Sequence, residues 1–105
     1  MGNNPLLRGL RATHPGEILR EDVFPAIDLP KSQIARMLGI SRQTLHDVLA
    51  ERQPVTPAMA LRLAKLLGNH AQFWVNLQRD YDLSVLSESM RDELAAIPPL
   101  PRSAA

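Results

Sequence analysis

Apolar side chains recur at helical spacing on both sides of a short break in the stretch KSQIARMLGISRQTLHDVLA. Ile34 and Leu38 lie four positions apart before the break, and a second apolar set follows it. Residues four apart share one face of a helix, so each side of the break has its own buried face. The break contains a glycine, which can end a helix in the left-handed conformation, and then Ser41, whose hydroxyl can cap the next helix. The pattern predicts two short helices, over about 31–38 and 42–50, joined by a tight corner.

Capping residues and apolar stripes predict a helix on each side of this corner. The first begins near residues 13–14, has Pro15 in its first turn, and turns three apolar residues inward: Ile18, Leu19 and Val23. The segment PAIDLP then connects it to the corner. After the corner, Thr56 and the proline that follows open a helix that Gly68 ends, and its apolar stripe consists of Met59, Leu63, Leu66 and Leu67.

Two more helices are predicted in the C-terminal part of the chain. Asn69 with Gln72 three residues on resembles a capping box, and it opens a fifth helix with one apolar face, formed by Phe73, Leu77 and Tyr81. A sixth helix over about 84–96 follows from apolar residues at every fourth position: Leu86, Met90 and Leu94. Because no alternating or aromatic strand pattern occurs, the sequence predicts an all-α fold.

The outward face of the second corner helix determines what the corner can do. With its apolar residues turned to the core, this helix leaves a polar set exposed: Arg42, Gln43, Thr44, His46 and Asp47. Arginine can pair with guanine and glutamine with adenine, while threonine offers a methyl group to thymine. Lys31, at the start of the preceding helix, could hold a phosphate. Two interpretations stay open on these residues alone: DNA recognition in the major groove and a purely structural corner, with His46 either a DNA contact or an exposed residue without a role.

Length and charge narrow the class of protein. The 105 residues suit one compact domain. The chain has no cysteine, no apolar run near the ~20 residues of a membrane helix, and no signal-peptide core, so we expect a cytoplasmic protein that does not enter a membrane. The net charge is only +1, but residues 31–79 carry +5 and residues 80–97 carry −4. The basic middle favours a nucleic-acid partner.

Catalytic and metal-binding motifs do not stand out in this sequence. His14, His46 and His70 lack close ligand spacing, and Glu21 and Asp22 are adjacent, which places them on different faces of a helix. No glycine-rich phosphate loop or nucleophile elbow occurs. We therefore expect no enzyme activity, no cofactor and no metal.

Four stretches together resemble a known family. The corner SQIARMLGISRQTL is similar to the helix-turn-helix of lambda-repressor-like, or XRE-type, proteins. With HPGEILREDVF, PVTPAMALRLAKLLG and FWVNLQRDYDL, the chain resembles HigA-type antitoxins over about residues 14–83. The resemblance implies a five-helix lambda-repressor-like domain, here with an additional C-terminal helix. It also implies a homodimeric repressor that binds palindromic operator DNA of its own operon and neutralises a HigB-type toxin, a RelE-fold ribonuclease that cleaves mRNA on the ribosome.

The same resemblance assigns roles to individual positions. It implies base contacts by Arg42, Gln43, Thr44 and His46, and phosphate contacts by Lys31, Ser41, Arg52 and Gln53. The chain departs from the family pattern at two places. Pro30 stands where a Ser or Thr cap is usual, and Ala50 and Glu51 replace a common Asn-Gly after the recognition helix.

The aromatic stretch FWVNLQ predicts packing rather than a cofactor pocket. We expect core or dimer packing for Phe73, Trp74, Leu77 and Tyr81. A dimer must present its two recognition helices about 34 Å apart to reach successive major grooves. The fifth and sixth helices are the candidates for the symmetric contact.

The predicted organisation has four parts: a flexible arm at 1–12, a DNA-binding domain at 13–83, a C-terminal helix at 84–97 and a disordered tail at 98–105. Arg62 and Lys65 are expected on a solvated helix face. Two alternatives to the autoregulating antitoxin remain: an interaction module that binds a toxin without operator recognition, and a free-standing XRE-type regulator.

Overall fold

The computed structural model describes residues 12–101, and this part of the chain is helical without any strand. Its elements are α1 (Pro15–Ile18), the helical turns η2 (Leu19–Val23) and η3 (Phe24–Ala26), α2 (Lys31–Leu38), α3 (Arg42–Leu49), α4 (Pro57–Leu67), α5 (Ala71–Ser89) and α6 (Arg91–Ala95). The prediction of an all-α domain of five helices with an additional C-terminal helix is confirmed. Most of the predicted N-terminal arm, and the end of the predicted tail, lie outside the described residues.

The first helix changes its winding along its length. It starts as α1, widens over η2, where the amide of Phe24 reaches back five residues to the carbonyl of Leu19, and ends in the tight turn η3. Pro25 has no N–H to continue the ladder of hydrogen bonds, so the helix stops there. Of the three residues expected to face inward, Leu19 is fully buried, and Ile18 and Val23 are half-buried.

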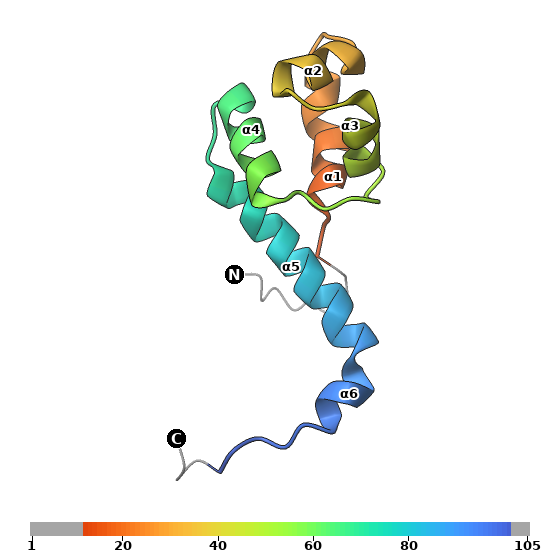
Figure 1. The fold of residues 1–105 in the computed structure, drawn as a ribbon, viewed down its shortest axis with the longest axis vertical. Coiled ribbons are helices and arrows are strands. Elements are labelled where there is room, and N and C mark those ends of the chain that lie inside the picture. Colours follow the sequence, from red (N-terminus) through yellow and green to blue (C-terminus); the bar gives the residue numbers. More distant parts are fainter. Residues whose placement is uncertain (1–11, 102–105) are drawn as a thin grey trace.

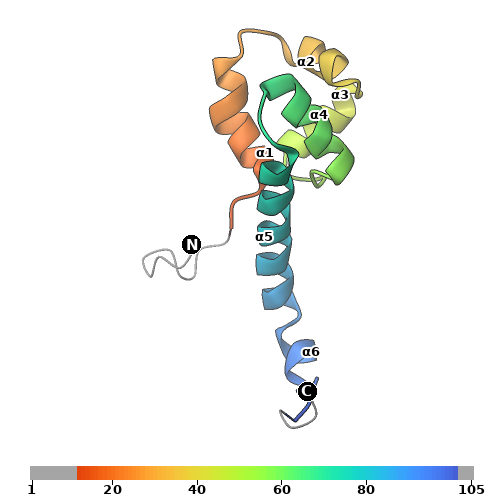
Figure 2. The same ribbon diagram turned by 90° about the vertical axis from the view of Figure 1, so that its left-hand side faces the viewer.

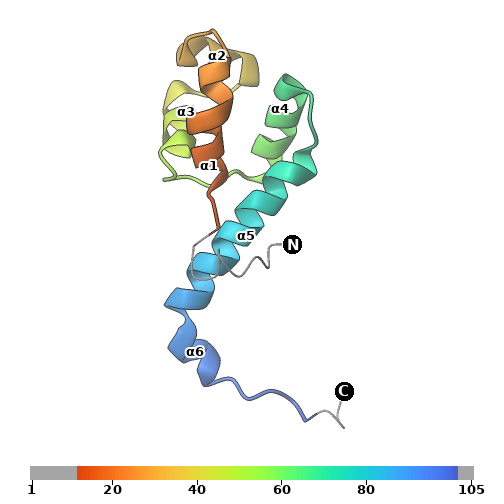
Figure 3. The ribbon, with the colours of Figure 1, turned by 180° about the vertical axis from the view of Figure 1, so that it is seen from behind.

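Helices α1 to α4 form a compact head around one core (Figure 1). Seen from behind, α1 lies between α3 and α4 (Figure 3). The core residues come from all four helices and from the start of α5, and the largest fully buried side chains are Trp74, Leu19, Ile34, Leu45, Leu63 and Val48. The head therefore fixes the position of α2 and α3, the two helices of the corner.

Helix α5 leaves the head as a long projection. It begins beneath α4 and runs away from the core, and α6 lies at the far end (Figure 2). The molecule is accordingly elongated, with principal extents of 56 × 29 × 23 Å. Residues 91–101 are exposed throughout.

Two sequence predictions about this half of the chain are wrong. The sixth helix does not begin at Ser84, because α5 continues to Ser89 and leaves only Arg91–Ala95 to α6. No glycine or proline occurs between Tyr81 and Ser89, and the carbonyl of Ser84 accepts a hydrogen bond from the hydroxyl of Ser87 within the helix. A helix without a breaker continues through such a position.

The predicted capping box is also absent. The N-cap of α5 is His70, which makes no side-chain capping hydrogen bond. The Asn69 side chain instead accepts a hydrogen bond from the Trp74 indole at 3.1 Å, and Gln72 donates to Asn76 at 2.8 Å. Because a buried indole N–H needs an acceptor, Asn69 serves the core rather than the helix end.

Candidate nucleic-acid interface

The corner between α2 and α3 has the geometry that its sequence predicts. Gly39 ends α2 in the left-handed region at φ 75°, and the amide of Ile40 closes the turn on the carbonyl of Ala35 at 3.0 Å. Ser41 then caps α3, accepting a hydrogen bond from the amide of Thr44 at 3.0 Å. Bonds within the corner thus satisfy part of each helix end and fix the turn between the two helices.

The start of α3 is the exposed part of this unit. Arg42, Gln43 and His46 are exposed and Thr44 is half-buried, whereas Leu45, Val48 and Leu49 are in the core. A shallow hollow of about 570 Å³ lies here, and its walls are Lys31, Arg42, Gln43, Leu45 and His46. The structure therefore brings together the lysine expected on a phosphate and three of the four residues expected on bases.

The two acidic residues near the end of α3 are both paired. Asp47 accepts hydrogen bonds from Arg52 at 2.9 Å and from Gln43 at 3.0 Å. Hydrogen bonding from Arg52, with a smaller contribution from Gln43, lowers the pKa of Asp47. Glu51 pairs with Arg20 at 3.2 Å. Pairing offsets the charge that each carboxylate would present to a phosphate, so the acidic residues do not exclude DNA from this face.

The polar residues at the start of α3 are held in different ways. The hydroxyl of Ser41 accepts from one backbone amide and donates to the hydroxyl of Thr44 at 2.9 Å, so the cap uses both its donor and its acceptor. The side-chain amide nitrogen of Gln43 donates one hydrogen bond to Asp47. A glutamine amide has a second hydrogen and a carbonyl oxygen, which are the groups that read adenine. Gln43 is therefore oriented and still free to contact a base.

Arg52 and Gln53 lie away from the hollow. Arg52 is bonded to Asp47, and Gln53 is half-buried beside Pro54 and Tyr81 on the side of the molecule that α5 covers. Glu51 adopts a left-handed conformation at φ 64°, so it keeps the backbone shape that a glycine would provide at this position. The Ala-Glu pair that stands where Asn-Gly is common thus still has a left-handed second residue.

The four residues expected in the core or in a dimer contact occupy three kinds of position. Trp74 is 1% exposed and belongs to the core, Leu77 and Tyr81 are half-buried, and Phe73 is 46% exposed. Phe73 meets the indole edge to face, with ring centres 4.9 Å apart. The face of α5 that packs on the head is therefore centred on Trp74 and Gln78 rather than on Phe73.

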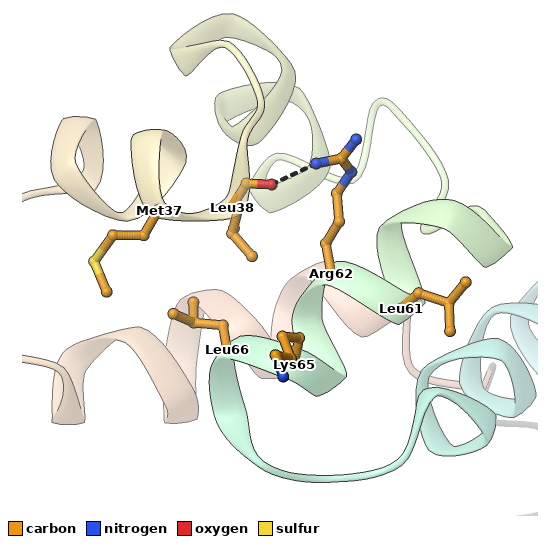
Figure 4. A pocket seen from close by; sticks show the side chains of 6 residues that line it. All are labelled: Met37, Leu38, Leu61, Arg62, Lys65 and Leu66. Carbon is orange, nitrogen blue, oxygen red and sulfur yellow. Dashed lines mark hydrogen bonds between the residues drawn. The ribbon is translucent and has the colours of Figure 1, made fainter.

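Arg62 has a structural partner that the sequence did not reveal. Arg62 is exposed, as expected for a solvated helix face, and its guanidinium donates a hydrogen bond to the carbonyl of Leu38 at 2.7 Å, across a groove between α2 and α4 (Figure 4). The other walls of this groove of about 690 Å³ are Met37, Leu61, Lys65 and Leu66. Arg62 thereby links α4 to the last turn of α2.

His14 is a second residue whose role the sequence missed. The side chain is buried, and Nδ1 accepts a hydrogen bond from the amide of Gly16 at 2.8 Å, which caps α1. Its ring packs against Tyr81 edge to face, with centres 4.8 Å apart. An Nδ1 that accepts is unprotonated, so the cap needs the neutral ring. His14 thus ties the start of α1 to the middle of α5.

Lowering the pH is expected to destabilise the fold through His14. Burial lowers its pKa from 6.5, outweighing Glu51 and Asp82, which raise it, while Arg20 lowers it further. As pH falls below 6.5, the unfolded chain binds the proton before the native chain does, so the free energy of unfolding falls until the native pKa is passed. Urea unfolding at pH 7.5 and 5.5 measures this loss.

A matched pair of variants isolates the histidine. His14→Asn keeps a side-chain acceptor at the cap but does not titrate, so it should lose much of the pH dependence. His70→Asn removes an exposed histidine and should keep the pH dependence of the parent. An unchanged pH dependence in His14→Asn would show that other groups cause the effect.

Within residues 12–101, no group of three or more His, Cys, Asp or Glu side chains could hold a metal ion. None of the described helices is long and apolar enough to cross a membrane.

Comparison with known proteins identifies the family. The helix-turn-helix family matches residues 26–74. Virulence-associated protein I of Dichelobacter nodosus is 36% identical over 87 residues, which is 83% of this chain and 81% of that protein. The structure of the antitoxin GraA superposes with a TM-score of 0.82 and 38% identity over 88% of this chain and 100% of that one. The Pseudomonas aeruginosa antitoxin HigA, solved with the higBA promoter, superposes with a TM-score of 0.80 and is 35% identical, over 87% of this chain and 100% of that one. The chain belongs to the HigA-type antitoxin family.

Membership of this family confirms the resemblance seen in the sequence. The corner of α2 and α3 is the helix-turn-helix of a DNA-binding repressor of the antitoxin class. The matched segment includes both corner helices, α4 and the first residues of α5. The solved structures of GraA and HigA that match this chain are named as antitoxins.

Proposed function

We propose that this antitoxin represses its own operon by inserting the start of α3 into the major groove of operator DNA. The observation that carries the proposal is the hollow where Lys31 meets Arg42, Gln43 and His46 on the exposed end of the recognition helix. The likeness to HigA solved with its promoter supports it. Operator binding requires a protein in the same compartment as the chromosome, so the proposal includes the expected cytoplasmic location. It assigns no catalytic role.

The proposed division of labour follows the chemistry of each side chain. Arg42 and Gln43 contact guanine and adenine, and Thr44 offers its methyl group to thymine, with His46 as a further base contact. Lys31, at the start of α2, holds a phosphate and sets the register of the protein on the duplex. Additional phosphate contacts are assigned to Ser41, Arg52 and Gln53, with Ser41 acting through its backbone because the cap occupies its hydroxyl.

A homodimer completes the proposed repressor. Two recognition helices must lie about 34 Å apart to reach successive major grooves of a palindromic site. The projecting α5 and α6, with the residues just after α6, expose large apolar side chains that a second copy would cover, namely Leu83, Leu86, Leu94 and Ile97. Symmetric pairing of these helices would leave both heads free to contact DNA.

Neutralisation of a HigB-type toxin is the second part of the proposed function. Residues 80–97 carry a net charge of −4, which complements a basic ribonuclease. The exposed acids Glu17, Glu21 and Asp22 provide a further acidic surface on the first helix. Co-purification with the protein encoded by the neighbouring gene, with and without operator DNA, tests this part separately from repression.

Removal of a base-reading side chain should weaken operator binding selectively. Arg42→Ala or Gln43→Ala is expected to cost about 1–3 kcal/mol of binding to the operator and little on a scrambled duplex, because each removes a contact to a base edge. Fluorescence anisotropy with the DNA upstream of the gene, over a series of salt concentrations, measures both affinities.

Lys31→Ala provides the contrast. Loss of a phosphate contact should weaken binding to all DNA about equally and reduce the slope of log affinity against log salt by about one. Unchanged operator affinity in both Arg42→Ala and Gln43→Ala would show that the start of α3 does not read DNA. A parent protein with equal affinity for operator and scrambled DNA would refute operator recognition as a whole.

A further inference from the structure

Two arginines from neighbouring helices hold the carbonyl ends of the helix-turn-helix. Arg62 of α4 donates from Nη1 to the carbonyl of Leu38 at 2.7 Å and reaches the carbonyl of Gly39 at 3.5 Å. Arg20 of η2 donates from Nη1 to the carbonyl of Leu49 at 2.6 Å. Leu38 and Leu49 are the last residues of α2 and α3. Each corner helix thus ends on a guanidinium that comes from outside the corner.

These bonds act where the helices lack partners of their own. The last carbonyls of a helix have no amide to accept from and lie at the negative end of the helix dipole, so a cation there is favourable. The contact of Arg62 is close: a Cβ built on Gly39 would lie 2.7 Å from its Nη1. The arginine therefore covers the turn itself, three residues before the first residue of α3.

Both bonds lie near an end of α3. Its first residues follow the turn that Arg62 holds, and its last carbonyl is bonded to Arg20, which also pairs with Glu51 in the following turn. Arg62 lines the groove between α2 and α4 (Figure 4), which shares no residue with the hollow at the start of α3. Arg62 is thus placed to orient the base-reading side chains without lying among them.

We propose that Arg62 and Arg20 are positioning residues for operator recognition, which fix the orientation of α3 within the head. The proposal rests on the proposed operator binding. A contact to a base edge needs correct distance and direction, whereas attraction to phosphate is tolerant of both. Loss of either arginine bond should therefore reduce sequence discrimination and leave general affinity for DNA unchanged.

Arg62→Met tests this directly, because methionine keeps an unbranched stem and removes the donor. Anisotropy titrations of operator and scrambled duplexes over a salt series should show operator affinity about tenfold weaker, the order of one misaligned base contact. Affinity for the scrambled duplex and the salt slope should stay as in the parent. Circular dichroism at the same temperature confirms that the variant is folded.

Three further variants make the test specific. Arg62→Lys keeps the charge and a donor on a similar but shorter stem, so it should recover part of the lost discrimination. Lys65→Met removes the same charge from the same groove of α4 and should behave as the parent. Arg20→Met should repeat the effect from the other end of α3, and it decides the question if Arg62→Met does not fold.

Three results would contradict the positioning role of the arginines. Equal weakening on both duplexes with a smaller salt slope would mean that the arginine contacts phosphate, which overturns positioning. Parent-like discrimination in folded Arg62→Met and Arg20→Met overturns it as well. If the parent does not discriminate between the duplexes, operator recognition fails first and positioning falls with it.

Discussion

Truncation of Trp74 to alanine is expected to lower the free energy of unfolding by about 3–5 kcal/mol, the usual cost of removing a large aromatic side chain from a core. The side chain is 1% exposed, packs among residues from the head, and satisfies its indole N–H on Asn69. It joins α5 to the head, so the loss should detach the projecting helix as well as create a cavity. Urea unfolding followed by circular dichroism measures the change.

The neighbouring aromatic residue is the control. Phe73 is 46% exposed, and Phe73→Ala should cost about 1 kcal/mol or less, mainly the edge-to-face contact with the indole. Trp74→Phe, which keeps most of the volume but no N–H, should fall between the two. Similar losses in Trp74→Ala and Phe73→Ala would mean that α5 does not pack on the head through Trp74.

The corner could be predicted from the sequence because its determinants are local. Gly39 supplies a left-handed residue and Ser41 a capping hydroxyl within three positions of each other, and both act on their own neighbours in the chain. The buried side of α3 follows from the same short periodicity, since Leu45, Val48 and Leu49 leave the polar residues outside.

The errors concern residues whose partners are distant in the chain. Arg20 donates a hydrogen bond to a carbonyl 29 positions away, and Arg62 to one 24 positions away. The charged residues around each arginine in the sequence do not predict such a partner. Nothing in the sequence around His14 distinguishes it from an ordinary polar residue, yet its ring packs against Tyr81. On α5, a stripe at every fourth residue favoured Phe73, but the side of this helix that contacts the head carries Trp74 and Gln78, so Phe73 is left exposed.

A methyl group added at Gly16 is expected to destabilise the head by about 2–3 kcal/mol, the upper part of the range seen when extra volume is forced into a packed core. Helix propensity alone predicts the opposite, because alanine in a helix is more stable than glycine by about 0.5–1 kcal/mol. Space decides the sign: a Cβ on Gly16 would lie 2.1 Å from the carbonyl oxygen of Val48. That atom is backbone, so α1 and α3 would have to move apart.

Gly68→Ala separates this steric effect from the general effect of replacing a glycine. Nothing lies within 4 Å of a Cβ at Gly68, so its cost comes only from the left-handed backbone at φ 73°, about 1–2 kcal/mol. Because Val48 belongs to the recognition helix, Gly16→Ala should also weaken discrimination between operator and scrambled DNA, and Gly68→Ala should not. A Gly16→Ala protein as stable as the parent would show that α1 and α3 do not approach as closely as their backbones indicate.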